Sequence, residues 1–143
     1  MQDRYLFRGK RKHNGEWVEG FLYIYQRDDT RKEEWCILQD ISTLTSDFKI
    51  NYVDPDTVGQ CTGRKDDSEK PYNIFDGDIL VGRWRELLDY GNVDLCEDVG
   101  AVSWNDVWGK WIVTDSTGTH DLYDWCEDVL VITNIYDEEG KDE

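Results

Sequence analysis

Few residues in this chain of 143 are of the types that carry out chemistry, and their spacing matches no common catalytic motif. General acid–base catalysis and nucleophile activation usually depend on histidine, or on carboxylates with separated pKa values. Both histidines are expected to be exposed, because His13 falls in a predicted turn and His120 closely follows a glycine. The sequence contains no nucleophile elbow, phosphate-binding loop or zinc-protease motif. It therefore predicts a protein that is not an enzyme.

Asp76 and Asp78 have a spacing that could suit a metal ion. Two carboxylates two residues apart point to the same face of a strand, where both can bind a cation. The alternative is a turn, in which the aspartates accept from nearby backbone amides and Gly77 adopts a positive φ. Because no third ligand follows at a suitable spacing, we favour the turn and predict neither a metal nor a cofactor.

The four cysteines show no metal-binding or redox pattern. They are far apart in the sequence, and no two form a C-x-x-C pair. The N-terminal residues lack an apolar signal segment, and no apolar run approaches the roughly 20 residues of a membrane helix. We therefore expect reduced, buried thiols, a cytoplasmic location and no membrane contact. The cysteines are Cys36, Cys61, Cys96 and Cys126.

The charge of the chain is unevenly distributed. The net charge is −16, and residues 1–35 carry eight basic and seven acidic side chains, so the remainder carries −17. A duplex-binding protein usually presents a basic face, whereas most of this surface would repel phosphate. In the acidic part, the pairs Glu97-Asp98 and Glu127-Asp128 are expected to be mostly solvated surface, with an acidic ridge of Asp124, Glu127 and Asp128 as the alternative.

One basic segment is compatible with nucleic-acid contact. Its cations interleave with two aromatic residues, a pattern that suits phosphate contacts together with base stacking. We favour the alternative, in which these cations pair with acidic groups of the chain or of a neighbouring subunit. The cations are Arg4, Arg8, Lys10, Arg11 and Lys12.

Antiparallel β-strands are the elements that must position these residues. Asn14-Gly15 lies between two apolar runs and is a strong hairpin signal. Strands are expected over residues 5–10, 17–25, 35–38, 47–53, 58–63, 77–81, 100–104, 110–114 and 129–136. Two helical exceptions are predicted: a short helix over 83–90, where Trp84, Leu87 and Leu88 have helical spacing, and one turn over 121–128.

Trp104, Trp108 and Trp111 also satisfy a helical spacing. Turn residues between them and β-branched residues on both flanks favour a hairpin instead. Trp108 lies at the predicted loop, so we expect its ring to be exposed. An exposed tryptophan would suggest an anchor for a partner.

The two halves of the chain share short matching segments. Self-similarity over a long period is typical of a repeated unit that buries its apolar face against its copy. We hypothesise a duplication within one domain, with candidate sub-units at residues 1–66 and 72–139. The matches are Phe7–Lys10 with Phe75–Asp78, Gly15–Val18 with Gly109–Ile112, and Thr57–Gln60 with Val131–Asn134.

Several segments resemble the YopX family of phage and prophage proteins, and they occur in the family's order across nearly the whole chain. The resemblance implies a single, mostly β domain over residues 1–143, encoded by a phage or prophage and present in the bacterial host cell. It implies no activity. The segments are FRGKR (7–11), GEWVEGF (15–21), VDPDTVGQCTG (53–63), IFDGDIL (74–80) and NIYDEEG (134–140).

The fold class predicted is therefore all-β and mainly antiparallel, with two small barrel-like, hairpin-built halves. The function predicted is a non-catalytic binding or interaction module that forms a homo-oligomer, since small β units leave edge strands that association can cover. A host or phage protein is the further partner expected. Two alternatives remain: nucleic-acid contact through the basic N-terminal hairpin, and an acidic inhibitor that mimics nucleic acid in a host protein's basic groove.

Overall fold

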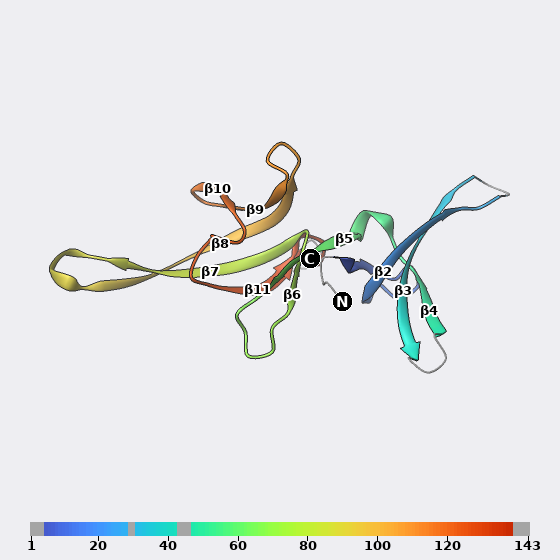
Figure 1. The fold of residues 1–143 in the computed structure, drawn as a ribbon, viewed down its shortest axis with the longest axis horizontal. Helices are drawn as coiled ribbons and strands as arrows, with labels where there is room; N and C mark the ends of the chain where they lie inside the picture. Colours follow the sequence, from blue (N-terminus) through green and yellow to red (C-terminus); the bar gives the residue numbers. More distant parts are fainter. Residues whose placement is uncertain (1–4, 29–30, 43–46, 139–143) are drawn as a thin grey trace. The chain divides into compact units, whose positions relative to one another are not determined.

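The computed structural model describes residues 5–28, 31–42 and 47–138, and antiparallel β-strands are the predominant secondary structure of these residues (Figure 1). The all-β prediction is therefore confirmed. The chain divides into two compact units between Cys61 and Thr62. Within the described residues the only α-helix is a single turn at the C-terminal end.

The first unit contains β1 (Phe7–Lys10), β2 (Trp17–Gln26), β3 (Glu33–Ser42), β4 (Asp47–Tyr52), the 3₁₀ turn η2 (Pro55–Thr57) and the start of β5 (Gly59–Lys65). The second contains the end of β5, β6 (Asn73–Phe75), β7 (Asp78–Leu87), the 3₁₀ turn η3 (Asp89–Gly91), β8 (Val93–Asn105), β9 (Lys110–Asp115), β10 (Gly118–Asp121), β11 (Asp128–Asn134) and α1 (Ile135–Glu138).

The two units have the same strand order. The first runs β4-β3-β2-β1-β5, with β6 added beyond β5, and the second runs β10-β9-β8-β7-β11. In each, four consecutive strands form a meander, and the first of them also pairs antiparallel with the fifth. This shared topology supports the hypothesis of an internal duplication.

The register of the strands defines which residues correspond. The backbone N–H of Val53 donates to the carbonyl of Trp35 at 3.0 Å, and that of Leu122 donates to the carbonyl of Trp111 at 3.1 Å. Trp111 therefore matches Trp35. The sequence comparison had matched it with Trp17, which begins β2 and not the third strand. Short identities misled the comparison because the loops of the two units differ in length.

A glycine bends the second strand of each meander. β2 pairs with β1 up to Gly20 and with β3 beyond it, and β8 changes partner in the same way next to Gly100. A Cβ on Gly20 would lie 2.3 Å from the carbonyl oxygen of Leu38, and one on Gly100 would lie 2.3 Å from Cγ1 of Val113. Only glycine permits this close approach, which curls each small sheet.

Each unit has its own hydrophobic core. In the first, Val18, Ile37 and Val53 are buried, with Phe7, Leu22, Trp35 and Val58 packed against them. In the second, the buried residues are Ile74, Leu80, Val102, Trp111, Val113, Leu122, Trp125 and Val129. Aromatic rings contribute to both cores, as the composition predicts.

The predicted helix over 83–90 is wrong. β7 continues as a strand to Leu87 and pairs with β8 along its whole length, and the chain then turns through Tyr90 at a φ of 65°. In the strand, Arg83, Arg85 and Leu87 point to one face and Trp84 and Glu86 to the other, so Trp84 and Leu87 do not share a face as they would in the predicted helix. Cross-strand partners in β8 decide in favour of the strand. The predicted turn of helix over 121–128 is likewise absent, and the last strand ends at Asn134.

Both predicted hairpins are present. Gly15, with a φ of 71°, closes the β1–β2 turn by donating its N–H to the carbonyl of Arg11 at 2.9 Å. Gly109, with a φ of 65°, closes the β8–β9 turn in the same way on Asn105, at 2.8 Å. Glycine suits both positions because the left-handed backbone region carries no steric cost for it.

Candidate functional site

The structure pairs the basic N-terminal residues with groups of their own unit. Arg8 is only 8% exposed, and its guanidinium lies 4.7 Å from the ring centre of Trp17. The Lys10 ammonium lies over the same ring at 5.3 Å. Arg11 donates to Asn51 at 3.0 Å and to Glu16 at 3.1 Å, and Lys12 donates to Glu34 at 3.4 Å. Arg4 lies outside the described residues.

Substitution of Arg8 tests whether this segment is structural. We expect Arg8→Ala to lower the free energy of unfolding by about 1–2 kcal/mol, because it removes a desolvated cation–π contact and its packing. Retention on a DNA column at low salt should be unchanged by the substitution. Lys12→Ala is the matched control and should cost about 0.5 kcal/mol or less, since its ion pair is exposed. Equal stability of the two variants, with DNA retention lost only in the first, would contradict this prediction.

Asp76-Gly77-Asp78 forms the expected turn. A carboxylate oxygen of Asp78 accepts the backbone N–H of Phe75 at 2.8 Å, and Gly77 has a φ of 90°. Asp78 is almost fully buried. Among the described residues, no three His, Cys, Asp or Glu side chains are grouped so that they could hold a metal ion.

Trp108 lies in the β8–β9 turn with 56% of its surface exposed, and Lys110 lies 5.4 Å from its ring centre. Its role as a partner anchor stays a prediction.

All four cysteines are free thiols, of which Cys36 and Cys61 are buried and Cys96 and Cys126 are half-buried.

A groove of about 590 Å³ opens in the second unit, between β7 and the β9–β10 hairpin with the connection that follows it. Its walls combine two indole rings with acidic side chains, one imidazole and one thiol. The lining residues are Trp84, Asp115, Thr117, His120, Asp121, Asp124, Trp125, Cys126 and Glu127. Two residues of the alternative acidic ridge, Asp124 and Glu127, are among them.

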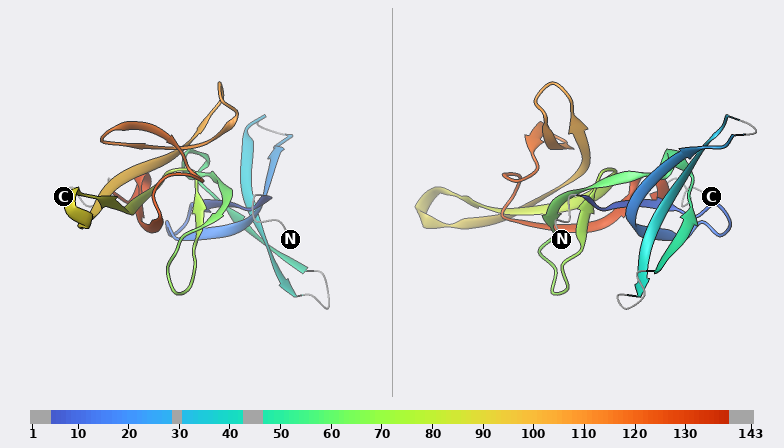
Figure 2. Two further views of the ribbon diagram at one scale, coloured as in Figure 1. Left: turned by 60° about the vertical axis from the view of Figure 1, so that its left-hand side comes forward. Right: turned by 45° about the vertical axis from the view of Figure 1, so that its right-hand side comes forward.

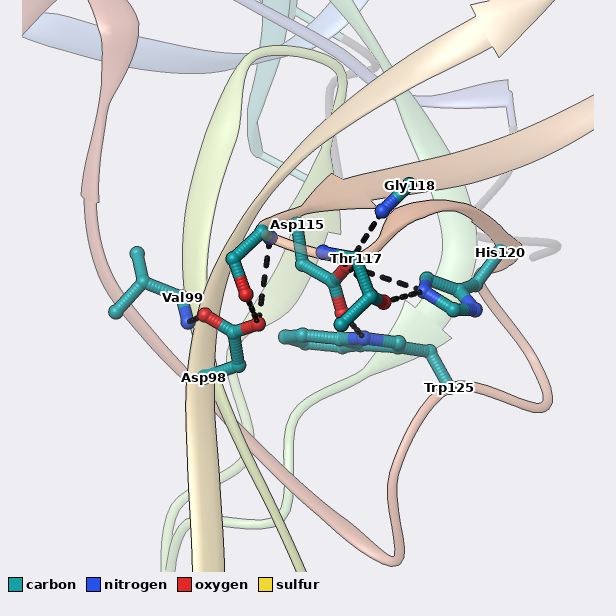
Figure 3. A network of polar contacts seen from close by, with 8 residues as sticks. Asp98, Val99, Asp115, Thr117, Gly118, His120 and Trp125 are labelled. Atoms are coloured by element: carbon teal, nitrogen blue, oxygen red, sulfur yellow. Dashed lines mark hydrogen bonds and ion pairs between the residues drawn. The ribbon is translucent and has the colours of Figure 1, made fainter.

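Asp115 is the centre of a polar network in this groove (Figure 3). Its Oδ2 accepts the indole N–H of Trp125 at 2.8 Å. Its Oδ1 accepts the backbone N–H and the hydroxyl of Thr117, at 2.8 and 2.7 Å, and the N–H of Gly118 at 3.2 Å. The same oxygen lies 3.0 Å from Nε2 of His120. The Asp115 side chain thus stabilises the turn Asp115–Gly118 by accepting hydrogen bonds from two of its backbone N–H groups.

These contacts fix the charge of Asp115 and the orientation of His120. Burial would raise the pKa of Asp115, but hydrogen bonds from Trp125, Thr117 and His120 outweigh it and hold the pKa far below its usual range. The carboxylate is therefore ionised and accepts only, so Nε2 of His120 carries a proton. The other ring nitrogen, Nδ1, points away from the network (Figure 3).

The groove does not provide an activated nucleophile. Burial, together with the nearby carboxylates of Asp115 and Asp98, raises the pKa of the Cys126 thiol to about 11. Cysteine reacts as the thiolate, which is scarce at neutral pH when the pKa is so high. The Thr117 hydroxyl is engaged with Asp115. What the groove offers is fixed negative charge beside aromatic surface.

Two of the remaining acids in the groove are neutralised by neighbouring cations. Asp121 pairs with Lys110 at 3.1 Å, and Glu127 forms a two-point contact with Arg85, at 2.8 and 3.1 Å. Asp124 is exposed, and its carboxylate has neither a hydrogen bond nor an ion pair within the part of the chain that the structure describes. It is the carboxylate of the groove available to a ligand.

The sequence analysis missed this groove. It treated His120 as an isolated exposed side chain and gave Asp115 no role. The two come together because the β9–β10 hairpin pairs Val113 with His120 and reverses the chain at Gly118. The Asp-Ser-Thr-Gly turn with a histidine two residues later is a local signal that could have indicated their contact. The approach of Trp84 and Trp125 is non-local and has no such signal.

A second surface is the β-arm, residues 84–96, formed by the outer ends of β7 and β8 and the turn between them. It projects beyond the other strands of its unit as a two-stranded ribbon (Figures 1 and 2). β11 stops pairing with β7 at Arg83, and β9 pairs with β8 only from Ala101. Among the described strands, neither strand of the arm has a second neighbour.

One face of the β-arm carries exposed aliphatic side chains. Leu87 pairs directly with Val93, and Leu95 follows on the same face opposite Arg85. Val99 lies on that face at the base of the arm, beyond the Arg83–Glu97 pair. We call these four residues the apolar arm face. Its exposed fractions are high for aliphatic side chains: Leu87 76%, Val93 56%, Leu95 80% and Val99 49%. Leu88 and Tyr90 are exposed at the tip.

These features define a class: an all-β protein of two units that share one order of five strands, in which the second unit carries a groove and a projecting arm with exposed aliphatic side chains. The chain belongs to the YopX family, because the family's sequence model, described as YopX protein, matches residues 6–140. Neither the curated proteins nor the solved structures contain a match to the chain. No helix among the described residues has both the length and the hydrophobicity to cross a membrane.

Proposed function

We propose that this chain is a non-catalytic interaction module that self-associates through the apolar arm face. The protein would act in the cytoplasm of a bacterial cell that carries the phage or prophage encoding it. The supporting observation is the exposure of Leu87, Val93 and Leu95 on one side of a ribbon whose two strands have no further neighbour among the described strands, with Val99 exposed on the same side at its base. Exposed apolar patches mark contact sites on soluble proteins.

The physical need for a partner follows from the strand count. A lone two-stranded ribbon is marginally stable in water, and further strands or a packed apolar face are needed to stabilise it. The apolar arm face and the two tip residues together expose on the order of 800 Å², which is what each partner contributes to a standard interface. Two arms packed face to face would therefore bury enough surface for a stable dimer.

Local charge also favours a second copy despite the net charge of −16. Arg83 lies 3.5 Å from Glu97, and Arg85 lies 2.8 Å from Glu127, so the charged residues that lie on the same face of β7 and β8 as the aliphatic side chains are compensated within one chain. Two copies of this face would meet without strong local repulsion. A two-fold dimer uses the same patch on both subunits, which suits a self-complementary apolar stripe.

Substitution of Leu95 tests this proposal. Sedimentation and light scattering of the wild-type protein, over the micromolar range, are expected to show a dimer. Leu95→Lys should weaken self-association about 100-fold, because each dimer would lose two buried leucines. Val107→Lys is the control, since Val107 is 90% exposed in the β8–β9 turn and the charge change is identical. A wild-type monomer at high concentration, or an equal effect of both substitutions, would overturn the proposal.

We place nucleic-acid contact second, because the described cations of the N-terminal hairpin already have partners in their own unit. The acidic inhibitor that mimics nucleic acid rests on net charge alone. Salt-sensitive co-purification of a strongly basic host protein would favour it.

A further inference from the structure

We propose that the groove of the second unit binds an organic cation, and that this cation is an arginine or lysine side chain in an exposed segment of a partner protein. The groove is a surface distinct from the apolar arm face. The proposal is therefore independent of self-association and can fail or succeed without it.

The size and walls of the groove suit a side chain with an apolar stem. Its volume of about 590 Å³ is within the range of small-molecule sites. Trp125 is almost fully buried and forms its floor, whereas Trp84 on β7 is half-buried. Indole faces attract cations, by about 0.5–1 kcal/mol at exposed sites and more when the cation is desolvated.

The charge of the groove selects a cation. Asp115 is held ionised by its hydrogen bonds, and its carboxylate is only 5% exposed. Asp121 and Glu127 are balanced by Lys110 and Arg85. Among the residues that line the groove, the charges without an arginine or lysine partner are therefore those of Asp115 and Asp124, both negative. A ligand cation near Asp124 would form an ion pair and also feel the field of Asp115.

The arrangement suits an organic cation better than a metal ion. Calcium takes six to eight oxygen ligands from the protein and water, and magnesium takes six in near-octahedral geometry, with one or two carboxylates bound directly to the ion. The carboxylates of Asp115, Asp121 and Glu127 are already engaged by N–H, O–H or cationic partners. A guanidinium or ammonium group needs only one carboxylate and an aromatic face, and Asp124 and Trp84 provide them.

Nitrogen-15 NMR of the full chain tests the proposal through the indole N–H signals. The probe is the peptide acetyl-Gly-Arg-Gly-amide. The control is the same peptide with uncharged citrulline in place of arginine. We expect the arginine peptide to shift the Trp84 signal with a Kd on the order of 1 mM. The citrulline peptide should bind at least tenfold more weakly. The Trp125 signal, whose proton bonds to Asp115, reports that the groove stays folded.

Matched variants separate the groove from bulk charge. Asp124→Asn should weaken binding of the arginine peptide by about fivefold to tenfold, and it is expected to fold because the side chain has no contact to lose. Asp106→Asn removes the same charge from the exposed β8–β9 turn and should change the Kd less than twofold. Equal effects of the two variants, or equal affinity for the citrulline peptide, would overturn the proposal.

A further arm of the experiment identifies the source of the cation. Agmatine carries the same guanidinium on a free alkyl stem without a peptide backbone. The proposal expects the peptide to bind at least as tightly as agmatine. Binding of agmatine without binding of the peptide would overturn the assignment to a protein partner.

Discussion

Gly20→Ala is expected to unfold the first unit. The new methyl group would lie 2.3 Å from the carbonyl oxygen of Leu38 and 3.0 Å from Cγ2 of Ile37. A backbone oxygen in the middle of β3 cannot move aside without breaking the pairing of β2 with β3. Inserting a carbon into packed structure usually costs 1–3 kcal/mol, and a backbone collision of this kind should cost about 4 kcal/mol or more.

Hydrogen exchange measured peptide by peptide is the appropriate measurement, because it reports on each unit separately. Protection should be lost in β2 and β3 of the Gly20→Ala variant. Gly100→Ala should have the corresponding effect on β8 and β9, since its methyl group would lie 2.3 Å from the buried Cγ1 of Val113. Gly109→Asn is the control, because its Cβ meets no atom within 4 Å and asparagine tolerates a positive φ. Native protection in both alanine variants would show that the strand bends do not depend on glycine.

Asp115→Asn is expected to destabilise the second unit by about 3 kcal/mol at neutral pH. The substitution removes a charge that accepts five hydrogen bonds, and it aims an amide group at donors such as the buried Trp125 indole and the Thr117 N–H. A buried donor left without its acceptor costs about 1–3 kcal/mol. Chemical denaturation followed by tryptophan fluorescence would measure the loss.

The pH dependence distinguishes the charge of Asp115 from simple packing. Its folded pKa is lowered from the usual value of about 3.9, so its contribution to stability is fully present above about pH 5. As pH falls through the folded pKa, the carboxylate takes up a proton and the contribution is lost. The stability gap between wild type and Asp115→Asn should therefore narrow steadily below pH 5. Asp106→Asn, an exposed control, should leave stability within about 0.5 kcal/mol throughout. A gap that stays constant with pH would assign the effect to packing.

Local signals predicted most of the strands and turns. Asn14-Gly15, Asp54-Pro55 and Asp76-Gly77-Asp78 each determine their own backbone path through steric and hydrogen-bonding rules, so the sequence alone is sufficient there. The stretch around Trp84 was predicted wrongly because its helical spacing is a local pattern, whereas pairing with β8 decides its structure. The partners of Arg85 and Leu87 in β8, which are Leu95 and Val93, are known only once the register is known.

The candidate sites were harder to predict because they depend on contacts between distant segments. The sequence indicated that the basic residues form a group. It did not indicate that Arg8 is buried against Trp17, which lies on the neighbouring strand. Likewise, the groove needs Trp84 from β7 beside Trp125 from a later connection. Residue spacing indicates neither the contact of Arg8 with Trp17 nor the approach of Trp84 to Trp125. The sequence indicated that the two halves correspond, but the segments that it matched were not the equivalent ones. Strand pairing defines the equivalent residues, and short identities do not.

The matching registers place different residues at one corresponding position of the two units. His120 lies opposite Val113, and its counterpart Asn51 lies opposite Ile37 in the first unit. Asn51 is buried, donating to the Ile37 carbonyl at 3.1 Å and accepting from Arg11 at 3.0 Å, so there the position serves only the scaffold. An ancestral gene that doubled would free one copy from selection for its original architecture. If the two units arose in this way, functional specialisation is expected at His120 and its surroundings, and not at Asn51.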